Sequence, residues 1–252
     1  MAKVQLERRD GGVRLVTLTD PDRRNALGDE MGAELLAAVG EVGADDDARA
    51  VVVTGAGSAF CAGADLPAMF GDPDRSVTET RAYLQGYYRA FLALRELPLP
   101  TIAAVNGPAV GAGLNLAMAC GIRIAGRDAT FGATFARIGL HPGGGCTHFL
   151  VEALGPSRAL RTLLLGDTLT AEQAVAWGLA EGPEDDPLAA ALDLAGKVAR
   201  VEPDLARHIV TAVRLAATTR DLDAVLEYEA WAQAASASSP TLQAWVARVR
   251  DA

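Results

Sequence analysis

Two apolar runs, each followed directly by a glycine-rich loop, constrain the fold of this chain more than any other feature. The runs occupy residues 50–54 and 101–105. Continuous apolar runs of this length are typical of strands that are buried on both faces of a parallel sheet. The loops at 55–65 and 106–119 are rich in glycine and alanine, whose small size lets a ligand approach the backbone closely. The order strand, glycine-rich loop, helix predicts an α/β (α+β) fold.

The remaining chain divides into an α/β part and a helical part. Alternating polarity around Asp10-Gly11-Gly12 predicts a β-hairpin at 4–8 and 13–19, and residues 122–125 predict a further strand. Helical spacing of apolar residues predicts helices at 29–42, 80–97, 158–165, 171–177, 188–201, 203–218 and 222–235. The break at 182–187 contains glycine, proline and three acidic residues. We therefore expect a core domain over 1–182 and a helical C-terminal region over 187–252.

Composition excludes several classes of protein. Half of the 252 residues are hydrophobic and 22% are charged, so a sizeable core can form. The net charge of −9 argues against nucleic acid or an anionic membrane as the main partner. We expect no signal peptide and no membrane span, since no run approaches the roughly 18 apolar residues that a span needs. Cys61, Cys120 and Cys146 lack CxxC spacing, which predicts reduced thiols and a cytoplasmic protein.

The second glycine-rich loop opens a helix, whose first N–H groups have no partner inside the helix. Such donors suit an oxygen that develops negative charge. A glycine-rich loop can also be only a turn. A phosphate-binding P-loop is excluded because no Gly-Lys-Ser/Thr triplet occurs. A dinucleotide fingerprint is disfavoured because Leu116 stands where its third glycine belongs.

Several motifs in this order resemble the crotonase (enoyl-CoA hydratase/isomerase) family. They are Asn25-Ala26-Leu27, Phe60-Cys61-Ala62-Gly63-Ala64-Asp65-Leu66, Asn106-Gly107-Pro108-Ala109 with Gly111 and Gly113, Phe131-Gly132 and Ile138-Gly139-Leu140 with Pro142. The resemblance implies a ββα superhelical core and a helical C-terminal trimerisation region, in trimers or dimers of trimers. It also implies an acyl-coenzyme A thioester as ligand, with no cofactor beyond the coenzyme A that belongs to the substrate.

The resemblance assigns roles to particular residues. The backbone N–H groups of Ala64 and Ala112 would form the oxyanion hole for the thioester carbonyl, beside Gly111. The adenine and pantetheine path would be lined by Ala26, Ala62, Asp65 and Leu66, with Arg23 or Arg24 near the nucleotide phosphates. Two plainer interpretations remain open: Asp65 is also a good N-cap for a short helix, and both arginines could be solvated.

The chain departs from a hydratase at the positions of the two catalytic glutamates. The resemblance places Asn115 and Phe135 there, and neither side chain can exchange a proton. A positioned acid or base typically contributes about 10² to 10⁴ in rate, so we expect classical hydration to be impaired. Asn115 could orient a water or bond a carbonyl, while Phe135 would shape an apolar wall. His141 is a candidate base, although a loop histidine bonded to backbone is the plainer interpretation.

Two function hypotheses follow. The first is an enzyme of hydratase or isomerase type in fatty-acyl-CoA metabolism that polarises a thioester carbonyl. The alternative is a catalytically inactive acyl-CoA-binding protein. A tunnel for the acyl chain could be narrowed by Met69, Phe70, Tyr83, Tyr87 and Phe135. A nucleophilic pair of Cys146 and His148 is disfavoured, because residues two apart on a helix point to different faces.

Overall fold

The computed structural model describes residues 2–219 and 221–250. The chain forms two compact units, Met1–Arg200 and Val201–Ala252. In the described residues no helix is both long enough and apolar enough to cross a membrane. The first unit contains the two predicted strands and both glycine-rich loops, so the site is described within that unit.

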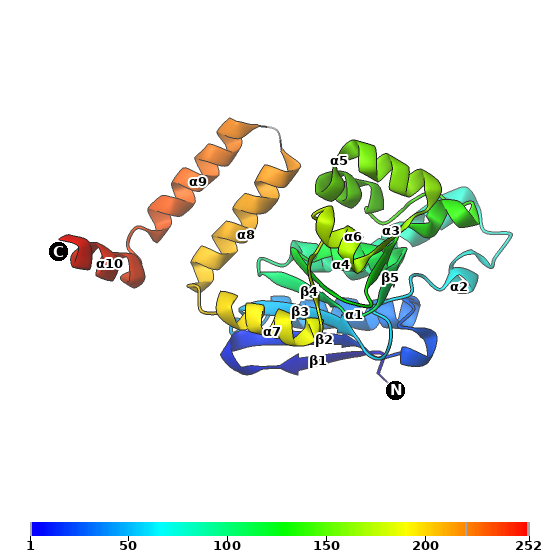
Figure 1. Cartoon of the computed structure of the whole chain (residues 1–252), viewed down its shortest axis with the longest axis horizontal. Coiled ribbons are helices and arrows are strands. Elements are labelled where there is room, and N and C mark those ends of the chain that lie inside the picture. The colour runs from blue at the N-terminus through cyan, green and yellow to red at the C-terminus, as the bar shows by residue number, and fades with distance from the viewer. Residues whose placement is uncertain (1, 220, 251–252) are drawn as a thin grey trace. The chain divides into compact units, whose positions relative to one another are not determined.

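A mainly parallel sheet forms the base of the first unit (Figure 1). In the described residues its order is β1-β2-β3-β4-β6-β9, and only the β1–β2 pair is antiparallel. The strands are β1 (Val4–Arg8), β2 (Val13–Leu18), β3 (Ala50–Gly55), β4 (Thr101–Val105), β6 (Ile122–Gly126) and β9 (Glu181–Glu184). The predicted hairpin is confirmed, since β1 and β2 join through a 3₁₀ turn over Asp10–Gly12. A small second sheet contains β5 (Pro108–Val110), β7 (Thr130–Gly132) and β8 (Thr168–Thr170).

Alternate residues of β3 enter two separate apolar clusters. Val51 and Val53 belong to the larger cluster, whereas Ala50 and Val52 belong to the smaller one. The smaller cluster includes Ala191 from α7 (Pro187–Val198), which packs on β3 and β4. The larger cluster packs the opposite face against α1 (Asp29–Gly43), α3 (Val77–Glu96) and α4 (Ala112–Ala119). Burial on both faces explains why residues 50–53 are all apolar, and it confirms the predicted buried strands.

Other helices of the first unit are α2 (Leu66–Phe70), α5 (Cys146–Leu165) and α6 (Ala171–Ala176). Helix α3 begins three residues before the predicted start, because Ser76 caps it and Glu79 completes a capping box. Helix α5 begins well before the predicted residue 158 and continues across Gly155, which has a non-helical φ of 74°. Glycine tolerates this positive φ, so Gly155 produces a kink within α5 and does not end the helix.

The predicted boundary at 182–187 does not coincide with the division between the compact units, which falls after Arg200. Helix α7 lies beyond that predicted boundary, yet it covers one face of the sheet. Its buried Ala191 and Ala195 are small enough to let the helix approach the strands closely. The Gly- and Pro-rich break instead leads through β9 into α7 within the first unit.

The second unit consists of helices in its described part: α8 (Pro203–Thr218), α9 (Leu222–Ser236) and α10 (Pro240–Arg250). Helices α8 and α9 run side by side (Figure 1). Between them, the His208 ring stands edge-on to Trp231 with ring centroids 4.8 Å apart. Large apolar side chains such as Leu226 and Trp245 are exposed. A role of this unit in trimerisation stays a prediction.

Candidate functional site

The two glycine-rich loops are joined by direct backbone hydrogen bonds. The Cys61 N–H donates to the Pro108 carbonyl at 3.1 Å, and the Val110 N–H donates to the Cys61 carbonyl at 3.0 Å. Behind this junction Gly113 leaves no space: a Cβ there would lie 2.0 Å from the Cys61 carbonyl oxygen. The absence of a side chain at Gly113 therefore allows helix α4 to pack directly on the first loop.

Residues 24–27 bind the first glycine-rich loop through two further backbone hydrogen bonds. The Ala62 N–H donates to the Arg24 carbonyl at 2.9 Å, and the Leu27 N–H donates to the Gly63 carbonyl at 2.7 Å. Asn25 is fully buried, and its Nδ2 donates to the Ala59 carbonyl at 2.9 Å. Asn25, which in the sequence is only part of a motif, holds the first loop in place with its side-chain amide.

Ala64 lies on the first loop and Ala112 on the second, close to the backbone hydrogen bonds that join Cys61 to Pro108 and Val110. In the described chain neither nitrogen donates to another backbone group. Ala112 is the first residue of α4, and Gly111 before it has φ 54° and ψ −114°, which suits glycine. A Cβ at Gly63 would lie 3.8 Å from the Ala112 nitrogen, so the residue beside Ala64 borders that amide directly. Two free donors are thus available to one acceptor, and one of them begins a helix.

Ala64 and Ala112 both line a cavity of about 130 Å³. Predicted site residues in its wall are Ala62, Ala64, Leu66, Gly111, Ala112, Asn115, Phe135 and His141, and the predicted tunnel residues Met69, Phe70 and Tyr87 join them. Arg23, Arg24, Ala26, Asp65 and Tyr83 are not in the wall. The cavity is also lined by Leu84, Tyr88 and Phe91 of α3, which the sequence motifs did not indicate. Their spacing of three and four residues on a helix was the available signal.

Comparison with known proteins identifies the family. Residues 8–246 match the family model described as enoyl-CoA hydratase/isomerase. The chain belongs to the enoyl-CoA hydratase/isomerase family. It is 50% identical over 217 residues to a protein named "Probable enoyl-CoA hydratase EchA14" from Mycobacterium tuberculosis, covering 85% of this chain and 82% of that protein. It is 38% identical over 222 residues to 1,2-epoxyphenylacetyl-CoA isomerase of Escherichia coli, covering 86% and 84%.

Solved structures agree with this assignment. The crystal structure of an enoyl-CoA hydratase from Bacillus anthracis superposes with a TM-score of 0.87 at 28% identity, covering 98% of this chain and 96% of that chain. The family resemblance and the predicted crotonase-like fold are therefore confirmed. Helix α4 and the two glycine-rich loops belong to this family fold.

In this family member Asn115 lies on α4, three residues after Ala112. Its side chain is 2% exposed, and its Nδ2 donates to the Gly143 carbonyl at 2.8 Å. Its Oδ1 is buried and, within the described residues, has no hydrogen-bond partner. Phe135 also lines the cavity and is half-buried, and its ring comes within 3.9 Å of a Cβ placed at Gly111. The amide therefore adds polarity to a cavity whose wall is otherwise mainly apolar.

His141 lies in the loop before α5. Its ring is exposed, and Nδ1 is 2.8 Å from the Pro142 carbonyl oxygen, so Nδ1 carries the proton in this contact. The plainer sequence interpretation, a loop histidine bonded to backbone, describes this geometry. His141 is also one of the residues that line the cavity.

The three cysteines are free and buried. Burial raises the pKa of Cys61 to about 11 and the pKa values of Cys120 and Cys146 to about 12. The thiols therefore stay protonated at neutral pH. His148 lies against Glu152, with Nε2 3.2 Å from Oε2, so its ring is engaged away from Cys146.

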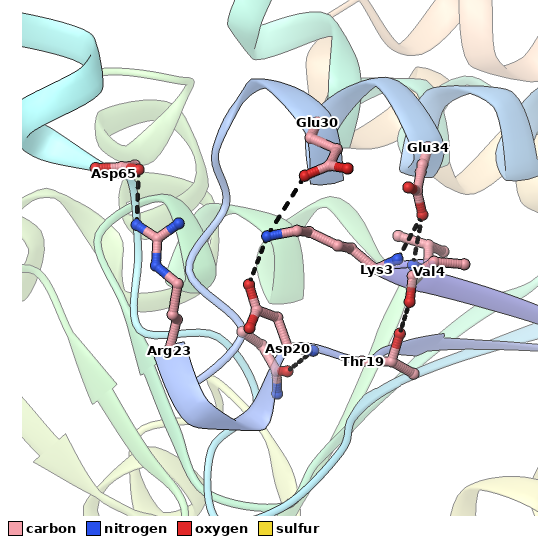
Figure 2. A network of polar contacts seen from close by, with 10 residues as sticks. Lys3, Val4, Thr19, Asp20, Arg23, Glu30, Glu34 and Asp65 are labelled. Atoms are coloured by element: carbon pink, nitrogen blue, oxygen red, sulfur yellow. Dashed lines mark hydrogen bonds and ion pairs between the residues drawn. The ribbon is translucent and has the colours of Figure 1, made fainter.

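Arg23 and Asp65 form an ion pair beside the site, as Figure 2 shows. The guanidinium Nη2 lies 2.7 Å from Asp65 Oδ2, while Oδ1 accepts from the Ala68 N–H at 3.4 Å and caps α2. The Arg23 hydrogen bond holds the pKa of the Asp65 carboxyl below its ordinary value. Asp65 is therefore the N-cap of α2, as its plainer interpretation predicted. Arg23 is half-exposed to solvent, but it is also paired with Asp65.

We expect Asp65→Asn to lose stability in a pH-dependent way. Asparagine keeps a capping oxygen but cannot pair with Arg23. The pKa of Asp65 is lower in the folded protein than in the unfolded chain. The ionised carboxylate therefore adds to the free energy of unfolding at any pH above the unfolded pKa of about 3.9. This stabilisation is lost as the pH falls through the folded pKa. Urea unfolding should show the variant less stable than wild type at pH 7, with a gap that closes below about pH 4. A gap that is constant between pH 7 and pH 3 would contradict this assignment.

Proposed function

We propose that this protein binds an acyl-CoA thioester in the cavity and polarises its carbonyl with the amides of Ala64 and Ala112. The observation that carries the proposal is that one mainly apolar cavity is lined by two residues whose amides have no backbone acceptor. Each donor of this kind is worth on the order of 10² to 10³ in rate when aimed at a developing oxyanion. The names of the relatives, an enoyl-CoA hydratase and an isomerase of a CoA thioester, support the same ligand class.

The acyl group would enter between α3 and the loop that carries Phe135. Met69, Phe91 and Phe135 contribute apolar surface there, which favours a fatty-acyl chain over a polar one. Outside the cavity, Ala26, Arg24 and the Arg23–Asp65 pair would border the nucleotide part. A phosphate would then compete with Asp65 for Arg23, because the two already form an ion pair. A cytoplasmic location and a trimer or dimer of trimers stay predictions.

The reaction proposed is of hydratase or isomerase type, with proton transfer not made by a carboxylate. Among the described residues that line the cavity there is no aspartate or glutamate. Asn115 and Phe135 cannot exchange protons, which leaves the His141 imidazole as the candidate base. The lack of a carboxylate among the described lining residues also favours a second candidate function, a protein that binds acyl-CoA without turning it over.

The first experiment is to mix purified protein with trans-2-enoyl-CoAs of rising chain length and to follow loss of the enoyl-thioester absorbance. We expect binding, with hydration at least about 10² slower than that of a family member with two catalytic carboxylates. His141→Ala should abolish the residual rate if the imidazole is the base, and free coenzyme A provides the binding control. A full hydratase rate would contradict the loss of carboxylate catalysis. Failure to bind any acyl-CoA would refute the proposed ligand, and binding without turnover would favour the second candidate.

A further inference from the structure

A groove of about 460 Å³ adjoins the cavity along helix α3. We call it the outer groove, and its lining residues are Arg75, Val77, Thr80, Arg81, Leu84, Gln85 and Tyr88. The lining residues of α3 lie three and four positions apart, so they share one face of the helix. Leu84 and Tyr88 also line the cavity, so the two hollows meet at these side chains. The outer groove is therefore a continuation available to an acyl chain that is too long for the cavity.

The cavity and the outer groove differ in charge. In the described part of the chain no lysine or arginine lines the cavity, whose wall is mainly apolar. Arg75 and Arg81 both line the outer groove, and no aspartate or glutamate among the described residues does so. A carboxylate left in the cavity would lose hydration without gaining a cation, which is costly. The same carboxylate in the outer groove would meet positive charge while still in contact with water.

Arg81 is the cation of the outer groove that remains available to a ligand. Its side chain is exposed, and it has no hydrogen bond or ion pair with any described residue. Arg75 is already engaged, because its Nη1 donates to the Met69 carbonyl at 3.0 Å. Glu79, the acid closest to Arg81 in sequence, accepts from the Ser76 N–H at 2.9 Å and from its Oγ–H at 2.6 Å. That carboxylate is thus held at the start of α3, and it leaves the charge of Arg81 unpaired.

We propose that the outer groove binds the far end of an acyl chain that carries a terminal carboxylate, with the carboxylate paired to Arg81. The inference rests on the proposed function, because it takes the thioester to be bound in the cavity. It adds a substrate class, the thioesters of dicarboxylic acids, and it sets a lower limit on their length. Arg81 precedes Leu84 by three residues, or about 4.5 Å of helix, so the chain must extend past Leu84 to bring its carboxylate to the guanidinium.

The test measures dissociation constants by calorimetry on the full chain, for pairs of CoA thioesters of rising length. Each pair consists of an unsubstituted acyl thioester and the thioester with the same number of carbons that ends in a carboxylate. The coenzyme A part is identical within a pair, so the ratio of the two affinities reports only the chain end. We expect the carboxylate to weaken the binding of short chains by about tenfold or more, because it stays in the cavity. In long chains it should strengthen binding by about two- to fivefold at low salt, as an exposed ion pair does.

An uncharged ligand and two variants test whether Arg81 causes this gain. Long chains that end in a carboxamide should show no gain, and the gain of the carboxylate should shrink as salt screens the pair. Arg81→Gln should abolish the gain. Arg89→Gln is the matched control and should keep it, because Arg89 is also exposed on α3 but does not line the outer groove. Both variants remove one positive charge from the same helix, so only a local role of Arg81 distinguishes them.

The outcomes separate this inference from the proposed function. If no thioester binds, the proposed function is refuted and the inference fails with it. If unsubstituted thioesters bind but a terminal carboxylate strengthens binding at no chain length, only the outer-groove inference is overturned. A gain that survives Arg81→Gln, or that Arg89→Gln removes equally, also overturns it, since the carboxylate would then be bound elsewhere on the chain.

Discussion

Replacement of Gly113 by alanine is expected to lower the free energy of unfolding by about 3 kcal/mol and to abolish acyl-CoA binding. The added Cβ would lie 2.0 Å from the Cys61 carbonyl oxygen and 2.8 Å from the Cys61 carbonyl carbon. Backbone atoms of a loop held by hydrogen bonds on two sides cannot rotate away from it, unlike the end of a flexible side chain. Helix α4 must therefore move off the first loop, which separates the Ala112 amide from Ala64.

The matched control is Gly86→Ala in α3. No atom lies within 4 Å of a Cβ at Gly86, and the residue is inside a helix. Alanine there should raise stability by roughly 0.5–1 kcal/mol, because glycine is the poorer helix former. Urea unfolding of wild type and both variants measures the two effects with opposite signs. If Gly113→Ala were as stable as wild type, the close packing of α4 on the first loop would not be needed for the stability of the fold.

The strands of the large sheet were predictable because burial imposes a strong pattern on sequence. Residues 50–53 and 102–105 are apolar without interruption, since their alternate side chains enter different clusters. The division between the compact units falls after Arg200, and not at the predicted 182–187, because α7 looks like any other helix in sequence. Nothing local in its alanine-rich sequence shows that these residues pack against the sheet.

The candidate site was predictable where it depends on backbone and less so where it depends on side-chain partners. Glycine and alanine at 63, 64, 111 and 112 indicated amides that a ligand can approach, and the structure brings these residues to one cavity. Asn115 was identified by position, but its orientation depends on Gly143, which lies 28 residues further along the chain. The Arg23–Asp65 pair joins residues 42 positions apart, and local sequence patterns carry no information about such a contact.

Ala112→Pro is expected to lower any turnover of enoyl-CoA by about 10² to 10³ while leaving the fold intact. Proline replaces the N–H that we assign to the oxyanion hole with its ring Cδ, so the donor is lost. The first position of a helix tolerates proline, because its amide has no partner within the helix. Proline restricts the residue before it through that residue's Cβ and N–H, and Gly111 has no Cβ.

Carbonyl polarisation can be measured without turnover, so this prediction also holds if the protein only binds. A bound enoyl thioester whose carbonyl is polarised should absorb at longer wavelength than the free compound. We expect Ala112→Pro to lose most of that shift, whereas Ala112→Gly should retain it because glycine keeps the N–H. Thermal unfolding confirms that both variants fold. A full shift in Ala112→Pro would mean that the Ala112 amide does not contact the carbonyl, and the proposed oxyanion hole would then be wrong at this position.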